Sequence, residues 1–276
     1  TIFIKNIHMK NLKIYCVTNK AVNFLDNTNY NIGWVGQEKP LKNYISCNSE
    51  DNIFYKEKYY SELTFQYWYW KNKLDLHDEN WIGFCQKRRF WINKKYANDE
   101  IKKFFFSDYI LQSVPDEWNG FDSVICEPIN VNKVKKMKMI KRGLKSIIKD
   151  PSIFFNEKKQ SLIFHFDMHH GYGNLNKAIS LVNDEDRADF LDYSNNSTSY
   201  SPHIMFIAKP KIADKWFNTL FPWLLRCEKE FGFKDLYGYD TQRLYAYLAE
   251  RYLSFWFNKH TNTIAWPWKF FDASQN

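Results

Sequence analysis

The sequence predicts a mixed α/β fold built on one central sheet. Three observations predict it: short apolar runs, amphipathic segments of helical periodicity between them, and polar residues directly after several runs. With 276 residues, the chain can form one large domain with a substantial core. We therefore expect a single domain over residues 1–260 and an aromatic tail over residues 261–276.

The predicted strands are short apolar runs bounded by polar residues, glycine or proline. They cover Lys13–Thr18, Tyr30–Gly36, Trp81–Cys85, Asp122–Pro128 and His203–Ala208. The predicted helices show apolar residues at spacings of three and four. They cover Tyr59–Lys71, Asp99–Phe106, Lys133–Lys149, Pro210–Phe231 and a last helix that Asp240 is expected to cap. No internal repeat is evident.

The formal net charge of +8 favours an anionic partner such as a nucleotide, a nucleic acid or a membrane surface. The five cysteines are scattered and lack CxxC spacing, which favours buried thiols in a reducing compartment. No apolar run approaches the length of a membrane span, and no signal-peptide pattern is present. We therefore expect a cytoplasmic protein that is soluble or lies at the inner face of the membrane.

A cluster of cations follows the most apolar run. Trp81–Cys85 leads directly into Gln86-Lys87-Arg88-Arg89. Cations at the carboxyl end of a buried strand are costly unless an anion lies there, and ligands of open α/β sheets bind at that edge. The cluster therefore predicts a phosphate or diphosphate site. The alternative is a set of ordinary surface cations paired with acidic neighbours.

Several motifs in a fixed order resemble a known family. They include KIYCVTNK (13–20), YYSELTFQYWYWKN (59–72), WIGFCQKRRF (81–90), DSVICEP (122–128), HIMFIAK (203–209) and YLAERYL (247–253). The chain resembles bacterial surface-polysaccharide enzymes described as domain of unknown function 4422, some of them assigned as galactofuranosyltransferases with a GT-A-like fold. The resemblance runs from Lys13 to about His260. The chain departs from the family pattern at Asn19, Gln86-Lys87 and His203, which concerns the donor sugar more than the reaction class.

The resemblance implies an inverting transfer of galactofuranose from a UDP-sugar to a glycan or lipid-linked glycan acceptor. The departing diphosphate gains negative charge that must be stabilised. Many GT-A enzymes use a metal bound by Asp-x-Asp, but this chain has Lys87, Arg88 and Arg89 at that strand position, so we expect no divalent metal and no cofactor. One alternative is a metal-dependent GT-A transferase of another sugar. The other alternative is a non-catalytic module that binds carbohydrate or nucleic acid. For the transferase, we expect no nucleic-acid partner.

The donor-binding candidates are spread along the chain. Thr18, Asn19 and Lys20 end the first strand, where they would meet the uridine, or else form a polar turn. Asp51 and Asn52 would bond the ribose or base. The resemblance implies that Glu62 lines the cleft, although an acid in the first turn of a helix is also favoured by the helix dipole. His169-His170, in a glycine-rich loop, would contact the donor diphosphate or sugar, and His203 would contact the sugar, with structural roles as the alternative.

An inverting transfer needs a base near the acceptor hydroxyl. Asp240 is the first candidate, with a simple helix N-cap as its alternative. Glu250 competes with it, because Arg243, Tyr247 and Glu250 share one helical face, and its alternative is a structural ion pair. Asp167 is a weaker third candidate.

The literal Asp-x-Asp, Asp184-Glu185-Asp186, is better explained as the acidic start of a solvated helix. Residues 130–160 form a basic amphipathic insertion, which would either dock on an anionic bilayer or cover the domain as a solvated helix. The aromatic tail would meet a membrane interface or an oligomer contact, or pack on its own domain. The oligomeric state is not predicted.

Overall fold

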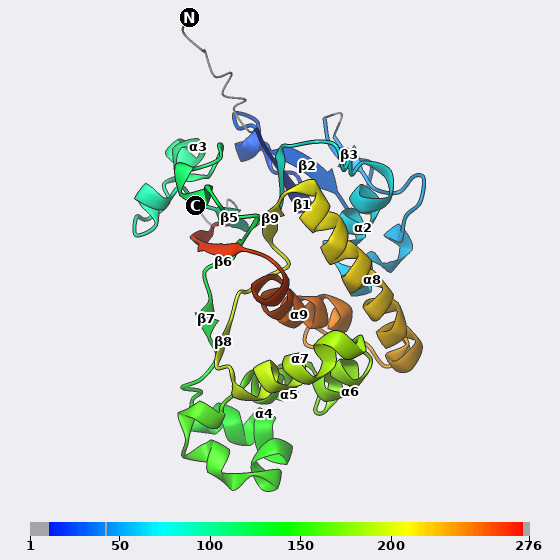
Figure 1. Cartoon of the computed structure of the whole chain (residues 1–276), viewed down its shortest axis with the longest axis vertical. Coiled ribbons are helices and arrows are strands. Elements are labelled where there is room, and N and C mark those ends of the chain that lie inside the picture. Colours follow the sequence, from blue (N-terminus) through cyan, green and yellow to red (C-terminus); the bar gives the residue numbers. More distant parts are fainter. Residues whose placement is uncertain (1–10, 42, 273–276) are drawn as a thin grey trace, which may run out of the picture.

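The computed structural model describes residues 11–41 and 43–272, so residues 1–10 of the predicted domain and 273–276 of the predicted tail lie outside it. A nine-stranded mixed sheet runs through the molecule, with helices packed around it (Figure 1). Its main path has the order β10-β6-β9-β4-β1-β2-β3. The strands of its parallel half are β1 (Leu12–Thr18), β2 (Asn31–Trp34), β3 (Ile45–Ser46) and β4 (Trp81–Gln86).

The other half of the sheet is mixed in direction. Strand β9 pairs antiparallel with both β4 and β6, and β10 pairs parallel with β6. Strand β5 forms a hairpin with β4 and pairs with β11. These strands are β5 (Arg89–Trp91), β6 (Ser123–Cys126), β9 (Phe206–Ala208), β10 (Thr263–Trp266) and β11 (Trp268–Phe270), and β7 (Ile129–Asn130) pairs with β8 (Ser199–Tyr200) in a separate two-stranded sheet.

The central strand β4 is buried on both faces, as its apolar run predicts. Ile82 and Phe84 pack in the core on one face of the sheet, and Trp81 and Cys85 pack in the core on the other. A Cβ on Gly83 would lie 2.6 Å from Ile207 Cγ1, so glycine is needed for the close packing of β4 against β9.

Helices α1 (Glu57–Tyr60), α2 (Leu63–Asn72), α8 (Pro210–Phe231) and α9 (Leu244–His260) pack in the larger core. The predicted Tyr59–Lys71 helix is interrupted, because Ser61 has a φ of 53° that no α-helical residue adopts. The predicted Asp99–Phe106 helix is wrong: α3 is Phe106–Tyr109, after a single 3₁₀ turn. The 3₁₀ turns η1–η7 are Asn23–Leu25, Phe54–Lys56, Lys94–Tyr96, Lys103–Phe105, Asp116–Trp118, Pro151–Phe154 and Glu157–Lys159.

A second helical group lies at the lower end of the molecule in Figure 1. It consists of α4 (Lys136–Lys149), α5 (Leu162–His170), α6 (Asn174–Ser180) and α7 (Asp184–Asn196). The basic insertion provides α4, which packs against α5 and the η6 turn. The aromatic tail provides β10 and β11, so its described part lies within the sheet.

The acidic triplet begins α7, as the sequence indicates. Asp184 is exposed, whereas Asp186 is buried against α9. Asp186 Oδ2 accepts a hydrogen bond from the Tyr252 hydroxyl at 2.7 Å. Its Oδ1 lies 2.8 Å from His260 Nε2 and 2.9 Å from Lys259 Nζ. Burial opposes ionisation, but the hydrogen bonds from these partners outweigh it and lower the pKa of Asp186.

We expect Asp186→Asn to lower the free energy of unfolding by about 1–3 kcal/mol, because it weakens a buried, charge-assisted network. A carboxyl whose pKa is lower in the folded state stabilises above its unfolded pKa, and this contribution is lost as the pH falls through the folded pKa. The difference in the free energy of unfolding between the variant and the unaltered protein should therefore narrow as the pH falls below 3.8, the ordinary pKa of an aspartate side chain. Urea unfolding at several pH values measures it.

The matched control is Asp184→Asn in the same turn of α7, where the exposed carboxylate forms an ion pair with Arg187. Its effect should stay within about 0.5 kcal/mol at every pH. Equal losses in the two variants would contradict the structural role of Asp186.

Candidate functional site

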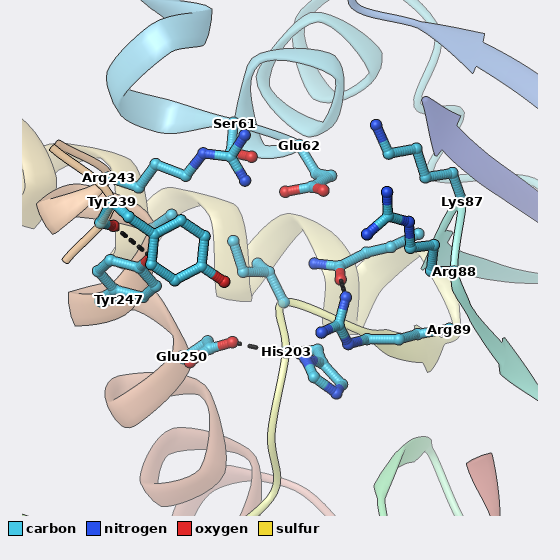
Figure 2. A pocket seen from close by; sticks show the side chains of 13 residues that line it. Ser61, Glu62, Lys87, Arg88, Arg89, His203, Tyr239, Arg243, Tyr247 and Glu250 are labelled. Carbon is cyan, nitrogen blue, oxygen red and sulfur yellow. Dashed lines mark hydrogen bonds and ion pairs between the residues drawn. The ribbon is translucent and has the colours of Figure 1, made fainter. Parts of the chain in front are cut away.

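A cavity of about 300 Å³ opens at the carboxyl end of β4. Four segments wall it: the β4–β5 hairpin, the break between α1 and α2, the residues before β9, and the first turns of α9 with the loop before it (Figure 2). The lining residues are Ser61, Glu62, Gln86, Lys87, Arg88, Arg89, His203, Ile204, Tyr239, Arg243, Ala246, Tyr247 and Glu250. Most of this lining is polar or charged, so the cavity fits an ionic ligand.

The three cations of the hairpin lie on one side of this cavity. Lys87 Nζ donates to Asn19 Oδ1 at 2.5 Å, and Arg89 Nη1 lies 3.4 Å from Gln86 Oε1. Arg88 Nε forms an ion pair with Asp272 Oδ2 at 3.0 Å. The alternative, in which these cations are surface residues paired with acidic neighbours, therefore applies to Arg88 in part. For Lys87 and Arg89, no ion pair is formed with a carboxylate of residues 11–41 or 43–272.

Positive charge is concentrated around the cavity. Burial lowers the pKa of Lys87, and the charges of Lys20 and Arg88 lower it further. Arg243 approaches from the opposite wall, and Glu62 lies between the two groups of cations (Figure 2). A bound anion would relieve this repulsion, and guanidinium groups suit phosphate oxygens in particular.

Two lining residues have strained backbones. Ser61 has a φ of 53° and His203 a φ of 67°, in the left-handed half of the map that non-glycine residues seldom adopt. His203 also has a buried Nε2 with no hydrogen-bond partner among the described residues. A group that is strained and unsatisfied in this way is typical of a ligand site.

Glu250 lies on the cavity wall in the second turn of α9. Its Oε1 is 3.7 Å from His203 Nδ1, and its Oε2 is 2.9 Å from Arg251 Nη1. Burial alone would raise the pKa of Glu250, but the contact with His203 and the charge of Arg251 hold it at about 2. Burial lowers the pKa of His203. At neutral pH, Glu250 is therefore an ionised carboxylate next to a neutral imidazole.

Asp240 does not cap α9, which begins at Leu244, so the expectation of a helix cap is wrong. The turn that contains Asp240 comes too early to supply the cap. Its carboxylate forms an ion pair with Arg142 of α4 at 3.1 Å, and its carbonyl lies 2.8 Å from His170 Nδ1. The adjacent Tyr239 lines the cavity, but Asp240 does not.

His169 and His170 form the last turn of α5 and not a loop. The His170 ring stacks on Tyr247 with centroids 3.8 Å apart, and so supports a lining residue from behind. His169 Nδ1 lies 3.2 Å from Arg142 Nη1. Burial lowers the pKa of His170 to about 3 and that of His169 to about 4, so both are neutral at pH 7. Neither lines the cavity.

The end of β1 lies beside the hairpin. The Thr18 hydroxyl donates to the Lys20 carbonyl at 2.7 Å and accepts from the Lys20 amide, so it forms the polar turn. Asn19 connects this turn to Lys87, and Asn19 and Lys20 line a neighbouring hollow of about 480 Å³ that continues along residues 34–39. The structure thus brings Asn19 and Lys20 next to the cations.

Asp51 and Asn52 lie elsewhere. The Asp51 carbonyl accepts a hydrogen bond from Asn72 at the end of α2, whereas Glu62 precedes the start of α2. Ten helical residues separate these ends by about 15 Å. Asp167 is also outside the cavity lining, and its two carboxylate oxygens accept hydrogen bonds from Ser146 and Gly173. The structure therefore does not bring Asp51, Asn52 or Asp167 to the cavity.

Some lining residues were not among the predicted site residues. Arg243 and Tyr247 share a helical face with Glu250, and this spacing was the available signal for them. Ser61 and Tyr239 carry no such signal, because a backbone break and a loop position bring them to the cavity.

Across residues 11–41 and 43–272, no three His, Cys, Asp or Glu side chains gather in a way that could hold a metal ion. Among the helices of the same residues, none is long and apolar enough to cross a membrane. The five cysteines are free and buried, as predicted.

The chain matches none of the curated proteins. It is similar to a solved structure described as the apo form of the WbbM bifunctional glycosyltransferase, with a TM-score of 0.73 and 18% identity. The similarity covers 95% of this chain but 46% of that chain, so this chain spans less than half the length of that protein. The shared fold confirms the predicted GT-A-like α/β architecture. Because the family profile matches residues 13–262, the chain belongs to the family described as Domain of unknown function (DUF4422).

Proposed function

We propose that the protein is a glycosyltransferase that moves galactofuranose from a UDP-sugar to a glycan acceptor with inversion. One observation carries this proposal: Lys87, Arg88 and Arg89 meet Arg243 around a cavity at the carboxyl end of a buried central strand. Family membership and the fold shared with a protein described as a glycosyltransferase support the transferase class. The sugar and the donor follow from the family resemblance.

In this proposal, the cations of the hairpin hold the donor diphosphate. Their charge is fixed before the reaction, so it stabilises the leaving group as negative charge develops. Asn19 and Lys20 then face the nucleoside, since they line the adjoining hollow. No divalent metal is needed for this step, because side chains that are already positive receive the charge.

Glu250 is the proposed base, in place of Asp240. Both carboxylates form an ion pair, Glu250 with Arg251 and Asp240 with Arg142, but Glu250 lies on the cavity wall and Asp240 does not. The acceptor hydroxyl would enter between Tyr239, Tyr247 and Glu250, opposite the hairpin (Figure 2). Glu62 is the second carboxylate of the cavity, and its position between the cations suits a contact to a sugar hydroxyl.

A donor assay in the presence of EDTA tests this function. With UDP-galactofuranose and a glycan acceptor, we expect glycosyl transfer with release of UDP, at a rate that excess EDTA leaves unchanged. Activity that EDTA abolishes and manganese restores would support the metal-dependent alternative. No transfer and no UDP binding would contradict the proposed function itself.

Arg88→Ala should lower kcat/KM by about 10²–10³, because it removes a cation that stabilises the leaving diphosphate. It should also reduce the rise in melting temperature that UDP produces. Asp272→Asn is the control, since it removes the partner of Arg88 but leaves the guanidinium in place. Asp184→Ala, in an exposed helix turn, should leave both quantities unchanged. Equal losses in Arg88→Ala and Asp184→Ala would show that phosphate is handled elsewhere.

Glu250→Gln should lower kcat by about 10²–10⁴, which is the usual contribution of a general base. Asp240→Asn should cost less than about tenfold, because it loses only a half-exposed ion pair. Because the pKa of Glu250 is about 2, kcat/KM should show no acid limb near neutral pH. The two variants are compared by steady-state kinetics and thermal melting. The reverse order of the two losses would return the role of base to Asp240.

A further inference from the structure

Helix α4 packs on the protein with a narrow side of mixed character, to which the half-buried Ile147 also belongs. Met139, Gly143 and Ser146 are its buried residues. A Cβ on Gly143 would lie 2.7 Å from the Phe164 ring, so glycine allows α4 to approach α5 closely. Met139 packs with Phe164 and Met168 in a small separate core. This contact fixes the orientation of α4 on the protein.

The more apolar side of α4 faces outward. Met137, Ile140, Leu144 and Ile148 follow one another at spacings of three and four, so they form one stripe. Their exposed fractions are 77%, 47%, 51% and 71%. An amphipathic helix of a soluble domain turns its apolar stripe to the core. Here Met139 and the half-buried Ile147 face inward, but the four-residue stripe faces outward. The alternative of an ordinary solvated covering helix therefore does not explain the orientation.

Cations surround the stripe. Residues 133–149 contain eight cations and no acidic residue: Lys133, Lys135, Lys136, Lys138, Lys141, Arg142, Lys145 and Lys149. All eight are exposed. Within the described part of the chain, Arg142 alone among them forms an ion pair. The charge of this surface is therefore left for a partner.

We propose that α4 docks on an anionic membrane surface, with its axis in the plane of the bilayer. The stripe would enter the boundary between headgroups and acyl chains, and the long lysine side chains would reach the anionic headgroups on either side. Charge complementarity selects this occupant, because an apolar stripe flanked only by cations matches a surface that is apolar within and negative outside. The proposal goes beyond the proposed transfer reaction, and its test needs no donor sugar.

Docking would also set the position of the cavity relative to the membrane surface. Arg142 leaves the same helix on its inner side and holds Asp240, next to the lining residue Tyr239. The helix that meets the membrane is thus connected by one ion pair to the loop at the cavity. A membrane-borne acceptor would then approach a cavity held near the surface.

Sedimentation with vesicles tests the docking. The full chain should bind vesicles of phosphatidylcholine and phosphatidylglycerol, bind vesicles of phosphatidylcholine alone at least about tenfold more weakly, and be released by high salt. Leu144→Ser with Ile148→Ser should lower binding about tenfold or more, because the stripe no longer inserts. Lys141→Glu with Lys145→Glu should lower it about twentyfold or more, since each lysine near the surface contributes several-fold.

Two control pairs match these variants. Leu191→Ser with Leu225→Ser changes exposed leucines on α7 and α8, and Lys215→Glu with Lys229→Glu changes exposed lysines on α8. Both pairs should bind as the unaltered chain does, within about threefold. Thermal melting of every variant confirms that it folds.

A dye attached to the stripe reports whether the stripe enters the bilayer. This measurement does not depend on a variant that loses vesicle binding. Because all five natural cysteines are buried, a new surface cysteine is labelled selectively. An environment-sensitive dye on Leu144→Cys should shift to the blue with anionic vesicles, and the same dye on Leu225→Cys should not. No binding to anionic vesicles, or equal binding by the stripe variant and its control, would overturn the proposal. The proposal would also be overturned if the unaltered protein sedimented as a dimer and Leu144→Ser with Ile148→Ser dissociated that dimer. The stripe would then bind a second protein chain and not a membrane.

Discussion

The site depends on the placement of fixed positive charge at the end of a strand that is buried on both faces. Strand β4 supplies no solvent-facing side along its length, so its first polar residues appear where it turns into β5. The hairpin keeps Lys87 and Arg88 in a short turn whose two arms are both held in the sheet. This rigidity matters because a preorganised charge needs no rearrangement when it stabilises another charge.

The other walls of the cavity are brought to this hairpin by irregular backbone. The chain turns sharply at Ser61, between two helices that would otherwise be one, and so places Glu62 opposite the cations. The segment before β9 turns in a similar way at His203. Strain at these two points is stabilised by the large core beneath them, in which α8 and α9 pack against the sheet. A stable scaffold thus supports a locally unfavourable site.

Much of this arrangement could be predicted from local sequence. The apolar run of β4 and the cations after it identify the central strand and the edge at which the cavity opens, and the spacing of Glu250 from Tyr247 identifies one wall. The position of Asp240 was missed because three residues of a turn separate it from α9, and that turn is held by contacts distant in sequence. The positions of Asp51 and Asn52 were missed for a similar reason. They lie at the end of α2 that is far from the cavity, and only the direction of α2 in the structure shows this. The outward stripe of α4 could not be predicted either, because periodicity defines an apolar side but not the direction in which it points.

The pairing of β10 with β6 has a consequence for folding while the protein is being synthesised. The ribosome makes these neighbouring strands about 140 residues apart, which corresponds to about 7–28 s of synthesis at ordinary elongation rates. Throughout that interval, β6 has an open edge of the kind that attracts other chains. Asp272, the counter-charge of Arg88, emerges later still. In the nascent polypeptide, this edge of β6 therefore stays uncovered until β10 has been made and pairs with it.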